Sequence, residues 1–336
     1  MKALFIGGTG IISSASSPLA VKQGFELTLL NRGKSARPTP EGVEVIHGDI
    51  NNLEETKKLL GDRKWDVVVN WINFVPSQIE RDIELFRGKT NQYIFISSAS
   101  AYQTPPASLP VRESTPLDNP YWEYSRNKIA CEEALLKAYR DEKFPMTIVR
   151  PSHTYDKTLL PFDYGYTILD RMLKGKPVVV HGDGTSLWTL THHTDFAKGF
   201  VGLMGHSAAI GEAFHITSDE WLTWNQIYDI VARAAGVEAK KVHVPSDILA
   251  VRDPNRGPGL LGDKSNSFIL DNSKIKSLVP AFTCTTPFSR GAQEIVAHYT
   301  APGVKGVVDP QKDALEDALC AEFGPLLRSY WQAENS

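Results

Sequence analysis

Short apolar segments alternate with helical segments over the first 150 residues of the chain. The first apolar run, Ala3 to Ile6, has no polar alternation, which is typical of a strand buried on both faces. Right-handed crossovers between such strands give a parallel sheet, so the pattern predicts a doubly wound α/β fold. Strands are predicted at 2–6, 26–30, 43–46, 66–70, 93–96 and 146–150, and helices at 11–23, 53–60, 77–86 and 124–142.

The pattern becomes irregular after residue 151. Helices are predicted there at 162–174, 195–204 and 223–235, and an amphipathic helix at 310–331. The stretch 252–262 is rich in proline and glycine and is predicted to be a mobile loop.

Composition adds few constraints to this picture. The 336 residues carry a net charge of −3, which argues against a dedicated nucleic-acid-binding surface. The scattered cysteines, Cys131, Cys284 and Cys320, indicate reduced thiols and a cytoplasmic protein. Met1 leads directly into the first strand and no apolar stretch reaches membrane-span length, so we expect no signal segment and no membrane partner.

A glycine-rich turn follows the first strand. Gly7 and Gly10 allow the close backbone approach that a pyrophosphate needs, and the following helix offers its positive end. Ser13 stands where a third glycine usually lets helix and strand pack, and serine is small enough for this position. Because a second strand follows, the turn predicts a dinucleotide site and not merely a strand–turn–helix with glycines for geometry.

The end of the second strand should select the cofactor, because an acidic residue there usually accepts from the ribose of NAD. This chain has Asn31, Arg32 and Lys34 instead. Two cations suit a 2′-phosphate, so NADP is favoured, with NAD as the alternative if Asn31 alone bonds the ribose. Asp49, after the third strand, would accept from the adenine amino group.

A tyrosine and a lysine four residues apart carry the candidate chemistry. Tyr124 and Lys128 share a face of one helix, and a nearby ammonium group lowers the pKa of a phenol. Tyr124 would then exchange the substrate hydroxyl proton during hydride transfer, while Ser98 polarises the same oxygen. The predicted cofactor contacts are Gly7, Thr9, Gly10, Ile11, Ile12, Asn31, Arg32, Lys34, Asp49, Ile50, Asn70, Tyr124, Lys128 and Pro151.

The chain resembles an extended short-chain dehydrogenase/reductase of the NAD-dependent epimerase/dehydratase type. The resemblance runs from Met1 to about Tyr299. It is closer to the branch whose second strand ends in Asn-Arg-Gly, and plant chloroplast RNA-binding relatives lie near that branch. It implies a Rossmann domain at 1–155, with the sheet completed by segments near 176–195, and usually a homodimer. It further implies a smaller C-terminal substrate-binding domain, mostly at 156–300, with 301–336 left as a linker and amphipathic helix. The residues that carry it are Gly7, Gly10, Asp49, Ser98, Tyr124, Lys128, Arg150-Pro151, Tyr155, His181 to Thr185, Asp195 and Asp271 to Lys274.

Departures from the family pattern bear on the substrate. His153 and Trp188 stand where nucleotide-sugar enzymes carry asparagine and a diphosphate-binding arginine, and Lys264 to Asn266 replaces another arginine. A conventional nucleotide-sugar is therefore in doubt, and an uncharged carbohydrate-like alcohol is favoured. Sugar dehydratases place Asp-Glu where this chain has Ala99-Ser100, so elimination lacks its acid and base. The residues expected to contact substrate are Ser100, Tyr102, Trp122, His153, Trp188 and His193.

These patterns predict an NAD(P)-dependent oxidoreductase or epimerase acting on a secondary alcohol or ketone of a carbohydrate-like substrate. Two alternatives remain: a nucleotide-sugar 4-epimerase with tightly bound NAD, and a non-catalytic nucleotide-sensing or RNA-associated protein. His192, His193 and Asp195 are adjacent potential ligands, but such close neighbours rarely converge on one metal ion, so no metal site is predicted.

Overall fold

A seven-stranded parallel sheet forms the centre of one structural unit in the computed structural model, which describes residues 1–334. This first unit comprises residues 1–154, 191–219 and 270–285. The sheet winds outward in both directions from β1, so the predicted doubly wound α/β fold is confirmed. The strand order is β11 (Ala213–Ile216), β6 (Met146–Pro151), β5 (Thr90–Ile96), β4 (Trp65–Asn70), β1 (Lys2–Ile6), β2 (Glu26–Asn31) and β3 (Glu44–His47).

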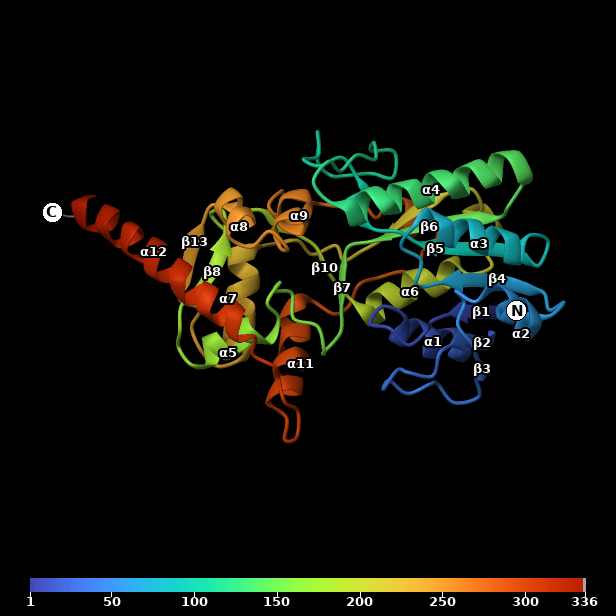
Figure 1. Ribbon diagram of the computed structural model, residues 1–336, viewed down its shortest axis with the longest axis horizontal. Helices are drawn as coiled ribbons and strands as arrows, with labels where there is room; N and C mark the ends of the chain where they lie inside the picture. Colours follow the sequence, from blue (N-terminus) through green and yellow to red (C-terminus); the bar gives the residue numbers. More distant parts are fainter. Residues whose placement is uncertain (335–336) are drawn as a thin grey trace. The chain divides into compact units, whose positions relative to one another are not determined.

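The strands are continuous apolar runs because helices cover both faces of the sheet. Phe5 and Val69 pack into the core on one face, and Leu4 and Val68 pack into the core on the other. Figure 1 shows α1 and α6 on one side of the sheet and α3 and α4 on the other. The first face is covered by α1 (Ser13–Lys22), α6 (His193–Leu203) and α10 (Ser273–Leu278), and the second by α2 (Leu53–Leu60), α3 (Pro76–Phe86) and α4 (Glu123–Glu142).

The strand that completes the sheet differs from the one expected near 176–195. β11 adds to the sheet beside β6, whereas β8 (Val178–His181) pairs in parallel with β13 (Lys241–Val244) in the second unit. The apolar run 178–181 does form a strand, but tertiary packing, and not the run itself, decides which strand it pairs with. The short elements of the first unit and of its junctions are η1 (Ala99–Ala101), η2 (Ser207–Ala209), β7 (His153–Tyr155) and β10 (Leu190–His192).

The second unit comprises residues 155–190, 220–269 and 286 onward. The stretch 252–262, expected to be mobile, instead forms α9 (Gly257–Gly259) and runs into a π-helical turn at Leu260–Lys264, where Leu260 is fully buried. The remaining elements are α5 (Tyr166–Leu173), β9 (Leu187–Trp188), β12 (Leu222–Thr223), α7 (Trp224–Ala234), α8 (Ser246–Arg252), α11 (Phe288–Thr300) and α12 (Pro310–Glu334).

Helix α12 is anchored to the second unit by a buried arginine. Arg171 Nη1 lies 2.5 Å from Asp313 Oδ1 and 2.8 Å from Asp317 Oδ1, and none of the Arg171 side chain is exposed. Glu316 Oε2 accepts the backbone N–H of Val179 at 2.8 Å. The first half of the predicted C-terminal helix is therefore held by charge pairs and by a bond to β8.

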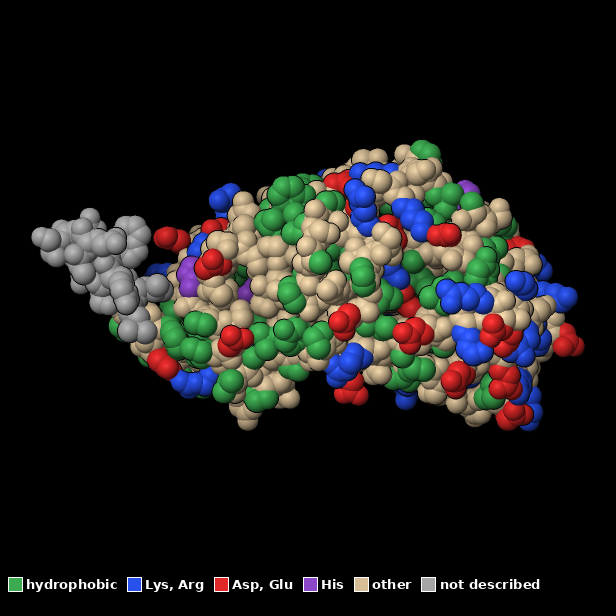
Figure 2. Space-filling model, turned by 90° about the horizontal axis from the view of Figure 1, so that it is seen from above, with side chains coloured by type: hydrophobic (Ala, Val, Ile, Leu, Met, Phe, Trp, Pro, Cys, Tyr) green, Lys and Arg blue, Asp and Glu red, His purple; other side chains and the backbone are tan. Residues whose placement is uncertain are grey.

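The surface agrees with the small net charge. On the face that Figure 2 shows, acidic and basic side chains lie interspersed. Within the described part of the chain, every helix is too short or too polar to cross a membrane.

Candidate functional site

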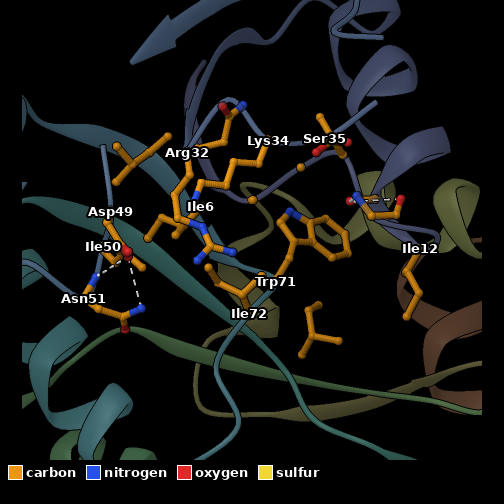
Figure 3. Close-up of a pocket in the computed structure, with 18 of the residues that line it drawn as sticks. Ile6, Ile12, Arg32, Lys34, Ser35, Asp49, Ile50, Asn51, Trp71 and Ile72 are labelled. Atoms are coloured by element: carbon orange, nitrogen blue, oxygen red, sulfur yellow. Dashed lines mark hydrogen bonds between the residues drawn. The ribbon is translucent and has the colours of Figure 1, made fainter. Parts of the chain in front are cut away.

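A cavity of about 760 Å³ opens at the carboxyl ends of β1, β2 and β4, within the first unit. The strand order reverses between β1 and β4, which is where doubly wound sheets bind ligands. Figure 3 shows side chains from these strand ends directed into the cavity. Ten of the predicted cofactor contacts line it: Gly7, Thr9, Gly10, Ile11, Ile12, Asn31, Arg32, Lys34, Asp49 and Ile50.

The glycine turn brings the backbone to the cavity wall. Gly7 and Gly8 have φ angles of +96° and +85°, a region that side-chain-bearing residues rarely adopt. A Cβ on Gly8 would lie 2.7 Å from Leu29 Cδ2, so the sheet leaves no room for one. Ser13 Oγ accepts the N–H of Gly10 at 2.8 Å, which fixes the turn at the start of α1. Gly8 is the most constrained of these positions, and the motif alone predicted only Gly7 and Gly10.

The end of β2 places two cations at the cavity. Arg32 and Lys34 are exposed and line the cavity, and Figure 3 shows the Arg32 guanidinium pointing into it. Asn31 Oδ1 accepts the N–H of Gly33 at 2.9 Å and so holds the turn. Asp49 Oδ1 accepts the N–H and Nδ2 of Asn51 at 3.0 and 3.1 Å. The cavity therefore has two positive side chains, Arg32 and Lys34, and one carboxylate, Asp49, which its bonds to Asn51 orient.

Four predicted contacts do not line the cavity: Asn70, Tyr124, Lys128 and Pro151. Asn70 is fully buried, and its Oδ1 accepts the N–H of Ile72 at 2.9 Å, so it shapes the loop after β4. Pro151 lies in β6 opposite Ile216 of β11. Side chains of the β4 loop and of the β5 and β7 ends line the cavity instead, and apolar residues at strand ends gave no signal in the sequence. The missed lining residues include Trp71, Ile72, Phe74, Ile96 and Thr154.

Lys128 is held by two backbone carbonyl groups at the end of β5. Its Nζ donates to Asn73 O at 2.6 Å and to Ile96 O at 2.8 Å. The Nζ also lies 4.6 Å from the centroid of the Phe74 ring. Only 3% of Lys128 is exposed, and this burial lowers its pKa to about 8 because the ammonium group loses its hydration.

Tyr124 lies one turn before this lysine on α4, as the spacing predicts. The Lys128 Nζ is 5.7 Å from the centroid of the Tyr124 ring. Trp122 and Phe74 pack on that ring at centroid distances of 4.8 and 6.4 Å, and Tyr124 is half-buried. The structure therefore brings a phenol and a partly desolvated ammonium group together.

Three serines form a bonded set beside α4. Ser98 Oγ lies 2.9 Å from Ser100 Oγ, which accepts from Ser125 Oγ at 2.8 Å. Asn119 Nδ2 donates to Ser100 O at 2.8 Å. Ser98 is half-buried, whereas only 4% of Ser100 is exposed. Ser100 therefore orients Ser98 and is not itself open to a ligand.

Tyr102 is fully buried and does not line the cavity. Arg150 Nη1 donates to its Oη at 2.7 Å, and the same oxygen bonds to His215 Nε2. Burial raises the pKa of Tyr102 well above its ordinary value and lowers that of His215. Arg150 also forms a two-bond pair with Glu132 of α4, at 2.9 and 2.5 Å. Because its hydroxyl is occupied, we do not retain Tyr102 as a substrate contact.

The other expected substrate contacts belong to different elements of the two units. His193 Nδ1 lies 3.0 Å from Ser14 Oγ at the start of α1, and His153 is half-buried in β7. Trp188 belongs to the second unit and is only 5% exposed. The centroid of its ring lies 5.8 Å from the centroid of the Trp224 ring. Among the described residues, no group of three metal-ligating side chains converges.

The chain is similar in sequence and in structure to several known proteins. The model of the NAD dependent epimerase/dehydratase family matches residues 3–217. A chloroplast stem-loop binding protein of 41 kDa from Arabidopsis thaliana is 29% identical over 260 residues, which cover 72% of this chain and 65% of that protein, less than two thirds of its length. The 2′-dehydrokanamycin reductase of Streptomyces kanamyceticus is 24% identical over 253 residues, covering 74% of this chain and 70% of that protein. A solved epimerase from Methanothermobacter thermautotrophicus matches with a TM-score of 0.73 and 18% identity, over 89% of this chain and 92% of that one, which shows the shared fold.

Proposed function

The chain belongs to the NAD-dependent epimerase/dehydratase family, and on that premise we propose that it is an NAD(P)-dependent oxidoreductase or epimerase. Its substrate would be a secondary alcohol or ketone of a carbohydrate-like molecule. The observation that carries the proposal is Lys128, fixed by two carbonyl groups beside Tyr124, next to the glycine-lined cavity. The three free cysteines support the cytoplasmic setting that we include in the proposal.

The cavity fits a dinucleotide. Gly7 and Gly8, whose φ angles are positive, and Gly10 line the cavity without side chains just before the start of α1. Backbone N–H groups at a helix N-terminus bind phosphate. Arg32 and Asp49 would hold the ribose and adenine ends. When bound, the nicotinamide supplies the acceptor or donor of the hydride.

The residues of this chain would handle the proton. When the substrate alcohol is oxidised, Tyr124 Oη takes the hydroxyl proton, and it returns a proton when the ketone is reduced. The Lys128 ammonium group favours the phenolate form that accepts this proton. Ser98, oriented by Ser100, donates a hydrogen bond to the reacting oxygen and stabilises its developing charge.

Cofactor preference gives one direct test. We expect calorimetric titration of the apo-protein to show about tenfold tighter binding of NADPH than of NADH, because Arg32 and Lys34 can pair with the 2′-phosphate. Arg32→Ala should remove the difference. Arg37→Ala, at a nearby loop arginine that does not line the cavity, is the matched control. Tighter NADH binding by the wild type would reject the NADP preference and leave NAD as the cofactor.

The arginines of the second unit support a substrate without a diphosphate. Three arginines of this unit could stand in for the diphosphate-binding arginines that nucleotide-sugar enzymes carry. All three are already paired with carboxylates: Arg252 with Glu322, Arg256 with Asp163 and Arg290 with Glu294. A buried diphosphate would need unpaired cations. One relative is named 2′-dehydrokanamycin reductase, a name that does not refer to a nucleotide-sugar, and this supports the proposal of a reductase with a different substrate.

We therefore expect free sugars, glycosides or polyols to raise the melting temperature of the coenzyme-loaded protein more than UDP-, GDP- or dTDP-sugars. A thermal-shift panel measures this, with the free nucleoside diphosphates as controls. A nucleotide-sugar that binds at micromolar concentration and is turned over would reject the substrate proposal. That result would favour a nucleotide-sugar 4-epimerase with bound NAD.

A non-catalytic, RNA-associated role is the second candidate, because one relative is named for stem-loop binding. The net charge of −3 and the interspersed surface charges weigh against it. A gel-shift titration with stem-loop RNA discriminates the two, since binding that is unaffected by Tyr124→Phe and is not accompanied by turnover would favour this role.

A further inference from the structure

A buried arginine on α3 bonds to two loops that border the cavity. Arg81 Nη1 donates to Asn51 Oδ1 at 2.7 Å, and its Nη2 donates to Asn73 Oδ1 at 2.9 Å. Its Nε and Nη2 also donate to Asp82 Oδ1 at 3.0 and 2.7 Å. Only 10% of the Arg81 side chain is exposed. One guanidinium group thus joins the loop after β3 to the loop after β4.

Asp82 fixes the second of these loops. Its side chain is fully buried, and its Oδ2 accepts from Asn70 Nδ2, Asn73 Nδ2 and Tyr93 Oη, each at 2.6 Å. A buried carboxylate requires such donors in place of water. Burial and the Asp82 charge raise the pKa of Tyr93, which keeps its hydroxyl a donor. Asp82 therefore holds both ends of the loop from Asn70 to Asn73.

Each loop carries one group of the candidate site. Asn51 donates its backbone N–H and its Nδ2 to Asp49, the expected adenine acceptor. The carbonyl oxygen of Asn73 accepts from Lys128 Nζ at 2.6 Å. Arg81 itself does not line the cavity. Any displacement of its guanidinium group would therefore reach both Asp49 and Lys128 through one bonded residue each.

We propose that Arg81 is a positioning residue that sets the adenine end and the Lys128 end of the dinucleotide site together. The inference rests on the proposed function, because it assigns Arg81 to the geometry of that site. A merely structural role, in which Arg81 only neutralises the buried Asp82, makes a different prediction. A lysine would satisfy that role, whereas its single nitrogen cannot bond to Asn51, Asn73 and Asp82 in the fixed directions of a guanidinium group.

The test compares Arg81→Lys with Arg87→Lys, which changes an exposed arginine after the last residue of α3. Calorimetry measures binding of the whole coenzyme and of ADP-ribose, which is NAD without its nicotinamide ring. Turnover is followed across pH to locate the alkaline loss of activity that belongs to Lys128. We expect Arg81→Lys to weaken binding of both ligands about tenfold, since it loses charge-assisted bonds to the cavity loops. We also expect its alkaline midpoint to fall, because Lys128 loses a well-placed acceptor.

A second variant separates the effect at the adenine end from the effect at the Lys128 end. Asn51→Ala removes only the adenine-side bond, so it should weaken ADP-ribose binding and leave the alkaline midpoint at the wild-type pH. Wild-type binding and midpoint in Arg81→Lys, matching Arg87→Lys, would overturn the inference while leaving the proposed function in place. A midpoint that moves equally in Asn51→Ala would also overturn it. If the wild-type protein binds no dinucleotide, the proposed function and the inference both fail.

Discussion

Tyr124→Phe is expected to lower turnover by about 100-fold or more and to leave coenzyme affinity nearly unchanged. The substitution removes the only atom of Tyr124 that can exchange a proton, and general acid–base catalysis contributes at least this factor. The phenyl ring keeps its packing on Trp122 and Phe74, so the wall beside Lys128 should remain intact. Turnover measured alongside calorimetric coenzyme binding separates chemistry from binding.

The matched control is Tyr121→Phe, which removes an exposed hydroxyl three residues earlier and should keep full activity. Full activity of Tyr124→Phe on a substrate that the wild type turns over would reject the mechanism. Loss of coenzyme binding in that variant would instead place Tyr124 in the binding wall.

The activity that depends on Tyr124 and Lys128 should change with pH in a direction that follows from the pKa of Lys128. The pKa of Lys128 falls from 10.5 to about 8 in the folded protein. Activity should therefore decline as the pH rises through about 8, because the ammonium group that favours the phenolate is lost. Stability should change in the opposite direction: between these two pKa values the unfolded chain binds the extra proton, so the free energy of unfolding rises with pH. In Lys128→Arg the alkaline decline should move to higher pH, and its persistence near pH 8 would assign it to another group.

Glu132→Leu is expected to lower the free energy of unfolding by about 3–5 kcal/mol, because it leaves a buried guanidinium group without its carboxylate. Arg150 forms two bonds with Glu132, whose side chain is fully buried, and Arg150 is itself only 6% exposed. A displaced Arg150 would also weaken its hydrogen bonds to the Tyr102 hydroxyl and to the carbonyl oxygen of Glu113, which accept from the same guanidinium group. Urea titration followed by circular dichroism at neutral pH measures the effect.

The exposed pair of Lys137 and Asp141 on the same helix provides the control, and Asp141→Asn should leave the urea midpoint within error of the wild type. Replacing both buried partners, as Glu132→Leu with Arg150→Met, should recover much of the loss, since no unpaired charge then remains. If Glu132→Leu is no more destabilised than Asp141→Asn, the buried pair does not contribute to stability as argued.

Features that depend on residues close in the chain could be predicted from the sequence. The apolar run at Ala3 to Ile6 becomes β1, and the glycines after it turn the backbone at the cavity. The spacing of Tyr124 and Lys128 places both on one face of α4. These predictions succeed because strand burial, positive φ angles and helical periodicity are local properties of a sequence.

Side-chain direction at neighbouring positions could not be predicted in the same way. Ser98, Ser100 and Tyr102 follow one strand within five residues, yet Ser100 bonds to Ser125 and Tyr102 bonds to Arg150 and His215. Those partners come from other strands and from α4. Proximity in sequence to Ser98, the candidate catalytic serine, therefore did not indicate access to the cavity.

The sequence by itself determined the doubly wound fold, the position of the glycine turn and the pairing of Tyr124 with Lys128. Only the tertiary structure decided which of the remaining polar residues line the cavity and which hold the surrounding loops in place. Asn70 and Arg81 belong to the frame because a buried carboxylate, Asp82, accepts hydrogen bonds from β4, from the loop after it and from its own helix α3. Burial sets the charge state and the partners of such groups, and burial is a property of the packed structure, not of any single segment.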